Sequence, residues 1–164
     1  MTYYRESQKF PTFLWLILAP VSLLMTGGAF QQLILKRPFG DNPMPDGWMF
    51  AIWLVFAVLL PVFFFFLELR TEVRSDGVHA RFYPLPSFGA IHYEDIEKVY
   101  VRDFRPIMEY GGWGLRFSRH GTAYIMRGKT GVQFELKNGK KILIGSQSAN
   151  ELRQAVEQAQ GGAR

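Results

Sequence analysis

The stretch VQFELKNGKKILI, residues 132–144, decides the fold class of the second half of the chain. Apolar and polar residues alternate through residues 132–136, which is the period of a strand with one face in a core. Asn138-Gly139 follows, a pair that favours a tight type I′ turn, and residues 140–144 return as a second strand. The sequence therefore predicts an antiparallel hairpin here.

An amphipathic helix is predicted directly after this hairpin. Ser148 and Glu151 have the spacing of a capping box, in which the two side chains accept hydrogen bonds from free amides at a helix start. Apolar residues then recur at helical spacing, at Leu152, Ala155, Val156 and Ala159. This stripe suits a helix that covers an open end of a sheet.

Short strands separated by turn residues precede the hairpin. The turn Ser75-Asp76-Gly77 predicts a tight reversal, and Pro84 and Pro86 end the following strand because proline donates no backbone hydrogen bond. The expected strands cover residues 71–74, 78–83, 88–92, 96–104, 113–117 and 123–126. With the hairpin they make seven or eight antiparallel strands, a small β barrel or sandwich with a C-terminal α-helix.

The segment YGGWGLR, residues 110–116, places three glycines beside a tryptophan. Because glycine weakens a regular strand, we expect the glycines to bend a strand at a barrel corner while the tryptophan packs into the core or against a membrane. A phosphate cradle is disfavoured, since the Gly-x-Gly-x-x-Gly spacing is absent and no Lys-Ser or Lys-Thr follows. We therefore interpret five residues as a structural motif: Tyr110, Gly111, Gly112, Trp113 and Gly114.

The first 69 residues contain two long uncharged runs, which predict membrane spans at about residues 13–35 and 47–67. The segment KRPFGDNPMPDG between them is dense in turn formers, so the two helices should form an antiparallel hairpin. A signal peptide is the alternative for the first run, but its apolar core usually has only about 7–15 residues. The chain thus divides into residues 1–69, a tail with a transmembrane hairpin, and residues 70–164, the β domain.

Basic residues beside the two spans predict their orientation, because lysine and arginine gather on the cytoplasmic side. Two lie in the turn, Lys36 and Arg37. Five lie in the tail and after the second span: Arg5, Lys9, Arg70, Arg74 and Arg81. We therefore expect a multi-pass protein of the inner cell membrane with both termini and the β domain in the cytoplasm.

Three segments resemble one known family: YGGWGLR, AYIMRGKTGVQFELKNGKKILIGS and NELRQAV, which cover most of residues 110–156. They are similar to bacterial pleckstrin-homology-like (PH-like) membrane proteins, in which one or two hydrophobic helices precede a small β domain. Residues 68–104 match only in their general pattern. The resemblance implies a PH-like fold and a membrane setting, and it implies no biochemical activity.

Composition and spacing indicate a protein that is not an enzyme and has no metal or cofactor site. The chain has no cysteine, and its histidines, His79, His92 and His120, lack ligand-like spacing. No combination of nucleophile, base and stabilising group is recognisable. We attribute the net charge of +5 to membrane flanks rather than to nucleic-acid binding, because no nucleic-acid-binding motif is present.

One region is basic without any acidic residue, between Glu109 and Glu135. It contains Arg116, Arg119, Arg127 and Lys129. Near an anionic leaflet each such side chain gains about 1 kcal/mol, whereas the alternative interpretation is a solvated strand face.

Two functions follow as hypotheses. The first is a membrane-anchored binding module that docks a protein partner or anionic lipid headgroups. The second is a structural or assembly subunit of a larger membrane complex. A homo-oligomer is compatible with both.

Overall fold

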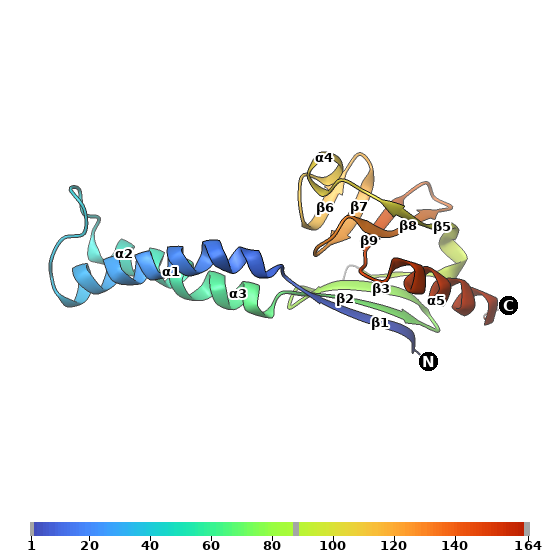
Figure 1. Ribbon diagram of the computed structural model, residues 1–164, viewed down its shortest axis with the longest axis horizontal. Coiled ribbons are helices and arrows are strands. Elements are labelled where there is room, and N and C mark those ends of the chain that lie inside the picture. The colour runs from blue at the N-terminus through green and yellow to red at the C-terminus, as the bar shows by residue number, and fades with distance from the viewer. Residues whose placement is uncertain (1, 87–88, 163–164) are drawn as a thin grey trace. The chain divides into compact units, whose positions relative to one another are not determined.

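The computed structural model describes residues 2–86 and 89–162 and has an α+β architecture (Figure 1). The chain forms two compact units. The helical unit spans Phe10–Phe66, and the sheet unit combines Met1–Lys9 with Leu67–Arg164. In chain order the helical unit is therefore an insertion within the sheet unit.

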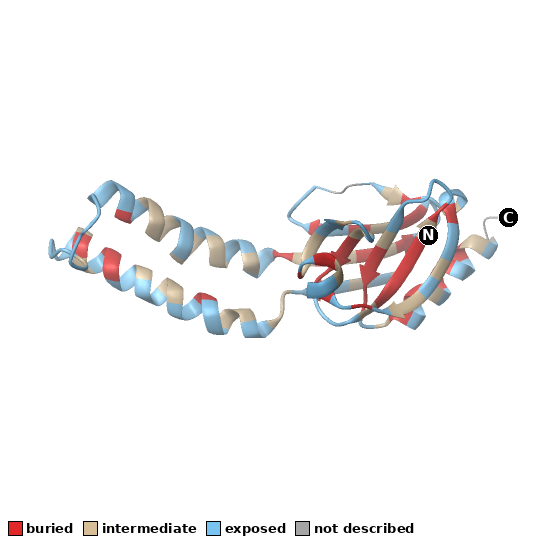
Figure 2. Ribbon diagram, turned by 90° about the horizontal axis from the view of Figure 1, so that it is seen from above, coloured by how far each residue is buried: buried red, intermediate tan, exposed pale blue. Residues whose placement is uncertain are grey.

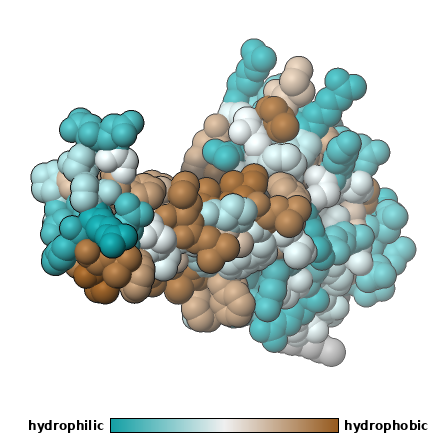
Figure 3. All heavy atoms as spheres, turned by 60° about the vertical axis from the view of Figure 1, so that its left-hand side comes forward, coloured by the Kyte–Doolittle hydropathy of each residue, from teal (hydrophilic) through white to brown (hydrophobic). Residues whose placement is uncertain are grey.

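Two apolar helical stretches make up the helical unit, which confirms the expected pair of helices. The first comprises η1 (Thr12–Leu14), α1 (Trp15–Ala29) and the π-helical η2 (Phe30–Ile34). The second comprises α2 (Asp46–Trp53), the π-helical η3 (Leu54–Leu59) and α3 (Leu60–Phe66). Both are long and apolar enough to cross a membrane. Apolar side chains, brown in Figure 3, cover much of their visible surface.

Residues 2–9 form a strand that the sequence pattern does not predict. β1 (Thr2–Lys9) pairs antiparallel with β2 (Glu68–Arg74), and Lys9 lies opposite Glu68 where the chain leaves for the helices and returns. The sequence pattern assigns this segment, with the transmembrane hairpin, to residues 1–69 as a tail. Its pairing with β2 instead makes it part of the sheet unit.

The first sheet has the strand order β1-β2-β3-β4. β2 and β3 (Gly77–Tyr83) form the hairpin predicted from Asp76-Gly77. β4 (Ala90–Ile91) lies within the strand expected over residues 88–92, of which residue 88 is outside the described residues.

The second sheet has the order β5-β8-β9-β7-β6, with η4 (Tyr93–Asp95) leading into it. Its strands are β5 (Ile96–Asp103), β6 (Gly114–Ser118), β7 (Gly121–Ile125), β8 (Thr130–Leu136) and β9 (Lys141–Gly145). The β8–β9 hairpin is confirmed. The expectation of a wholly antiparallel fold is wrong, because β9 enters between β8 and β7 and runs parallel to β7. The described residues contain nine strands rather than seven or eight, and β1 is the unexpected one.

The main core contains side chains from both sheets and from α5 (Ala149–Gly162). Phe82 of β3 stacks on Tyr124 of β7 with ring centroids 6.2 Å apart. Leu152 and Val156 of α5 are fully buried, as the helical stripe predicts. Figure 2 shows the buried segments in red, concentrated in the strands.

The YGGWG motif ends a helix rather than bending a strand. Pro106 opens the short helix α4 (Pro106–Tyr110), and Gly111 ends it with a left-handed φ of 71°. Trp113 then packs against a small cluster formed by Phe104, Tyr110, Ala123, Ile125 and Leu143. The expected packing role of the tryptophan agrees with this cluster, but the role given to the glycines is corrected.

Candidate functional site

The structure does not bring the four sequence-predicted basic residues together. Arg119 lies in the turn before β7, whereas Arg127 and Lys129 follow β7. At about 3.3 Å per residue, this strand separates them by roughly 16 Å. Arg116 lies on β6, where its Nε donates to the Trp113 carbonyl at 2.7 Å.

A different group of basic residues gathers on one face of the first sheet. In β2 the side chains of Leu69, Thr71 and Val73 are fully buried, so the alternate residues point outward. Cross-strand register places the exposed residues of β1 and β3 on the same outer side. We call this surface the basic face: Arg5, Ser7, Lys9, Glu68, Arg70, Glu72, Arg74, His79, Arg81 and Tyr83.

Two glutamates neutralise part of the basic face. Glu68 accepts a hydrogen bond from Arg70 Nε at 2.8 Å, and Glu72 lies 3.2 Å from Arg5 Nε and also pairs with Arg74. The Arg70 hydrogen bond lowers the pKa of Glu68, and the Arg74 hydrogen bond lowers the pKa of Glu72. Both carboxylates therefore stay ionised. Five basic residues against two acidic ones leave a formal excess of three positive charges.

Arg70 and Arg81 lie directly opposite each other on β2 and β3. Like charges in this position destabilise a sheet unless something compensates them. Arg70 is compensated by Glu68 and by the ring of Tyr83, whose centroid lies 4.7 Å from its guanidinium carbon. Arg81 is exposed and forms no ion pair with any residue that the structure describes. An anion placed between the two guanidinium groups would remove the repulsion.

Contacts of the buried side of β1 hold this strand, and with it two of the basic residues, in place. Gln8 is fully buried and its Nε2 donates to the Gly145 carbonyl at 2.8 Å. Glu6 accepts hydrogen bonds from Ser146 Oγ at 2.6 Å and from the Gln147 amide at 2.9 Å. The first strand is thus tied to the end of β9, immediately before α5.

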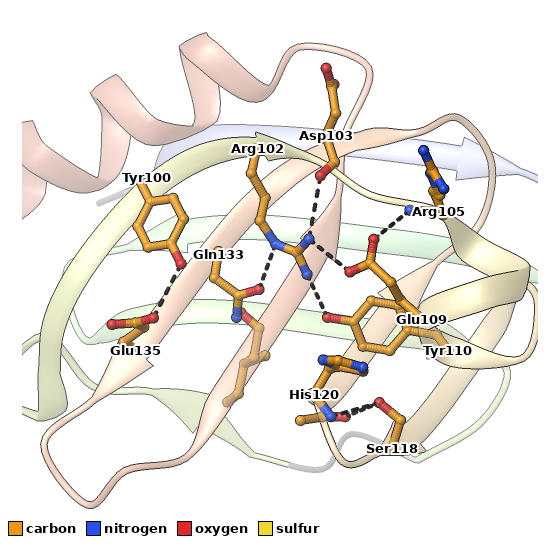
Figure 4. A network of polar contacts seen from close by, with 12 residues as sticks. Tyr100, Arg102, Asp103, Arg105, Glu109, Tyr110, Ser118, His120, Gln133 and Glu135 are labelled. Atoms are coloured by element: carbon orange, nitrogen blue, oxygen red, sulfur yellow. Dashed lines mark hydrogen bonds and ion pairs between the residues drawn. The ribbon is translucent and has the colours of Figure 1, made fainter.

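The outer face of the second sheet carries a polar network that is paired within itself (Figure 4). Arg102 donates to Gln133 Oε1 at 3.0 Å, to Glu109 Oε2 at 2.8 Å and to the Tyr110 hydroxyl at 2.9 Å. Burial acts to raise the pKa of Glu109, but hydrogen bonds from the Arg105 amide and from Arg102 outweigh it and lower the pKa. These contacts fasten α4 to β5 and β8.

The same outer face has a second paired group. Glu135 lies 3.3 Å from Lys141 Nζ and 3.9 Å from Lys98 Nζ, and it accepts a hydrogen bond from Tyr100. In the described part of the chain, no three His, Cys, Asp or Glu side chains are grouped to hold a metal ion.

The chain matches a known protein family. A family model, described as a family of unknown function (DUF6141), matches residues 2–162. The chain belongs to this family. The match includes β1, both apolar helices and the sheet unit, so the family is defined over the whole arrangement. No curated protein and no solved structure matches the chain.

In the sequence, the five basic residues of this face indicate only the orientation of the spans. Their spacing indicates that they share a surface, because the polar residues of this face recur at every second position. These residues are Arg5, Ser7 and Lys9 in the first segment and Glu68, Arg70, Glu72 and Arg74 in the second. Spacing of two indicates strand faces. When residues 2–9 are assigned to a tail instead of a strand, this shared surface cannot be inferred.

Proposed function

We propose that the protein is a non-enzymatic membrane-anchored module in which the apolar helices form a transmembrane hairpin and the basic face docks the sheet unit onto anionic lipid headgroups. One observation carries the proposal. All five basic residues that lie in the tail before the first helix or in β2 and β3 after the second lie on the same outer face of the same sheet. Charges that served only to orient two helices would not need to share a face.

Exposed apolar side chains support the membrane anchor. Leu16 is 79% exposed, Leu23 73%, Trp48 68% and Phe65 62%. Leaving such surface in water costs about 25 cal/mol per Å², whereas a bilayer removes this cost without any further protein contact.

The charge on the basic face supports weak docking to lipid. At about 1 kcal/mol per unbalanced charge, an excess of three gives about 3 kcal/mol, which corresponds to a dissociation constant above about 1 mM. A covalent tether raises the effective concentration to the millimolar range. The anchor therefore strengthens a contact that a free domain forms only weakly.

We also propose that the sheet unit is PH-like and that it faces the cytoplasm with both termini. The C-terminal helix on two sheets and the resembling segments of residues 110–156 support the first part, and the five-to-two basic count supports the second. Because the chain has no cysteine, single cysteines can report sidedness. An impermeant reagent applied to intact cells should label Asn42→Cys and spare Ser75→Cys. The reverse labelling would overturn the orientation.

The anchor can be tested by removing it. Lys9 lies opposite Glu68 at the end of the β1–β2 register, so a two-residue Asn-Gly turn can replace residues 10–67 and close β1 onto β2. We call this protein the excised form. It should be soluble and folded, whereas the full chain should stay in the membrane fraction. Membrane retention of a folded excised form, or extraction of the full chain by salt alone, would argue against the hairpin as anchor.

The lipid contact can be tested with matched charge reversals. The excised form should bind phosphatidylserine vesicles weakly, and added salt should abolish this binding by screening. Arg81→Glu should weaken it, whereas Arg127→Glu, a reversal of another exposed arginine, should not. If Arg127→Glu has the larger effect, the region first identified from the sequence is the lipid contact instead of the basic face.

A second candidate function, a subunit of a larger membrane complex, is favoured by exposed aromatic residues on α3. Phe63 is 38% exposed, Phe65 62% and Phe66 54%, and such rings can pack against other spans. Mass measurement after extraction in native lipid separates the two functions. A single stable assembly of high mass would favour the subunit.

A further inference from the structure

A hollow lies where the second sheet has its parallel pair of strands. β7 and β9 begin side by side, so the β6–β7 turn and the β8–β9 turn meet at one end of the sheet. The hollow between them has a volume of about 550 Å³. Its main lining residues are Phe117, Arg119, His120, Lys140, Lys141 and Ile142.

Charge at this hollow is of one sign. Arg119, Lys140 and Lys141 line it, and none of the described lining residues is acidic. Lys141 is partly neutralised by Glu135 at 3.3 Å. Arg119 and Lys140 are exposed and form no ion pair with any other residue of ranges 2–86 and 89–162. Two cations therefore face the hollow without a counter-charge.

Local hydrogen bonds shape both turns. The His120 amide donates to Ser118 Oγ at 3.1 Å, and the Lys140 amide donates to Asn138 Oδ1 at 3.0 Å. Gly121, with φ of 109°, brings the two backbones together: a Cβ there would lie 2.1 Å from the Lys141 carbonyl oxygen. The position of the two turns relative to each other is thus set by backbone contact.

The wall of the hollow is apolar on one side. Phe117 is 72% exposed although it lies on a strand, and Tyr124 and Ile142 continue the wall inward. The latter two residues also line a small recess of about 60 Å³, closed by Val78, Ala80 and Ile91. A basic opening therefore adjoins an apolar recess.

We propose that this hollow binds a small anionic ligand that carries a short apolar group. A phosphate or carboxylate would pair with Arg119 and Lys140, and the apolar group would lie against Phe117 and reach toward the recess. The proposal is independent of the lipid contact of the basic face, because no residue is shared between the two surfaces.

The test uses the full chain in phosphatidylcholine nanodiscs and three probes: phenyl phosphate, inorganic phosphate and phenol. Calorimetry should show phenyl phosphate binding about tenfold more tightly than either of the others, because only it uses both charge and apolar contact. The Arg119→Glu and Lys140→Glu double variant should weaken phenyl phosphate at least about tenfold. Arg127→Glu with Lys129→Glu, the matched control beyond the other end of β7, should leave it unchanged.

Phe117→Ser tests how much the apolar wall contributes to phenyl phosphate binding, apart from the charged residues. Because this side chain is exposed, the variant should keep the melting temperature, weaken phenyl phosphate and leave inorganic phosphate unchanged. If a charge-reversal variant lowers the melting temperature, Arg119→Gln with Lys140→Gln replaces it. Equal losses in both charge pairs, or equal affinity for phenyl phosphate and inorganic phosphate, would overturn the proposal.

The source of the anion is distinguished by adding phosphatidic acid to the nanodiscs. Competition with phenyl phosphate would assign the site to a lipid headgroup. Retained phenyl phosphate binding without competition would assign it to a soluble ligand.

Discussion

The outer faces of the two sheets contain similar residue types but arrange them differently. On the second sheet, Arg102 pairs with Glu109, and Glu135 pairs with Lys141 and Lys98. On the first sheet, only two glutamates lie among five basic residues, and Arg70 lies directly opposite Arg81. One face is neutralised by its own contacts, and the other keeps a positive excess.

The difference distinguishes charged residues that stabilise the fold through paired contacts from charged residues that are free to bind a ligand. Arg102 makes three side-chain contacts that fasten α4, so its removal would leave several polar groups unpaired. Arg81 makes no such contact among the described residues and opposes a like charge. We infer that stability and lipid binding should respond to different faces.

The largest expected loss of stability comes from a core residue that lies under both sheets. Leu152 is fully buried on α5, which contacts strands of both sheets, β1 and β2 on one and β5 and β8 on the other. Leu152→Ala should therefore cost about 2–5 kcal/mol of unfolding free energy. Urea unfolding of the excised form measures this, with Trp113 as its only tryptophan.

The partly exposed residues Arg153 and Glu157 on the same helix serve as controls, and alanine at either should cost less than about 0.5 kcal/mol. Equal losses at all three positions would mean that the two faces do not rest on one helix-covered core.

Arg102→Ala should cause the next largest loss of unfolding free energy, and it should not affect lipid binding. It leaves Glu109, Tyr110 and Gln133 without a shared partner, which should cost about 1–3 kcal/mol in this half-buried position. Vesicle binding of the folded fraction should not change. A loss of vesicle binding with unchanged unfolding would reverse the roles assigned to the two faces.

Acid should weaken the first sheet in a predictable direction. The folded pKa of Glu72 lies below the ordinary pKa of a glutamate, so the stabilisation is present at pH values above that ordinary pKa and is lost as pH falls through the folded pKa. Glu72→Gln should make unfolding free energy less sensitive to pH in this acidic range. An unchanged slope would mean that its pairing with Arg74 does not stabilise the fold.

Arg81→Ala should have the smallest effect on stability. Removing one of two opposed guanidinium groups should leave the unfolding free energy unchanged or raise it by up to about 0.5 kcal/mol. A loss comparable to that of Arg102→Ala would show that Arg81 belongs to a structural network after all.

Local patterns predicted most elements of the sheet unit and the pair of apolar helices. Alternation and Asn138-Gly139 located the β8–β9 hairpin, and the apolar stripe located α5. β1 was missed because its exposed and partly buried residues are nearly all polar, so alternation of hydrophobicity was absent. The partner of β1 lies beyond an insertion of 57 residues, and local sequence carries no information about such pairing.

The candidate site was missed for the same reason. The five basic residues are visible in the sequence, but only the β1–β2 register places Arg5 and Lys9 beside Glu72 and Glu68. The four residues first grouped as a patch are close in sequence, yet β7 separates Arg119 from Arg127. Sequence proximity is a poor guide where one strand can carry two residues to opposite ends of a sheet.

The most direct test of the lipid contact is a proximity measurement on the full chain in nanodiscs. A fluorophore at Tyr83→Cys reports the basic face, and one at Lys98→Cys reports the outer face of the second sheet. With a quencher on the lipid headgroups, replacing phosphatidylcholine by phosphatidylserine should increase quenching at Tyr83→Cys only, and salt should reverse the increase. Quenching that ignores lipid charge, or that rises equally at both positions, would contradict docking through the basic face.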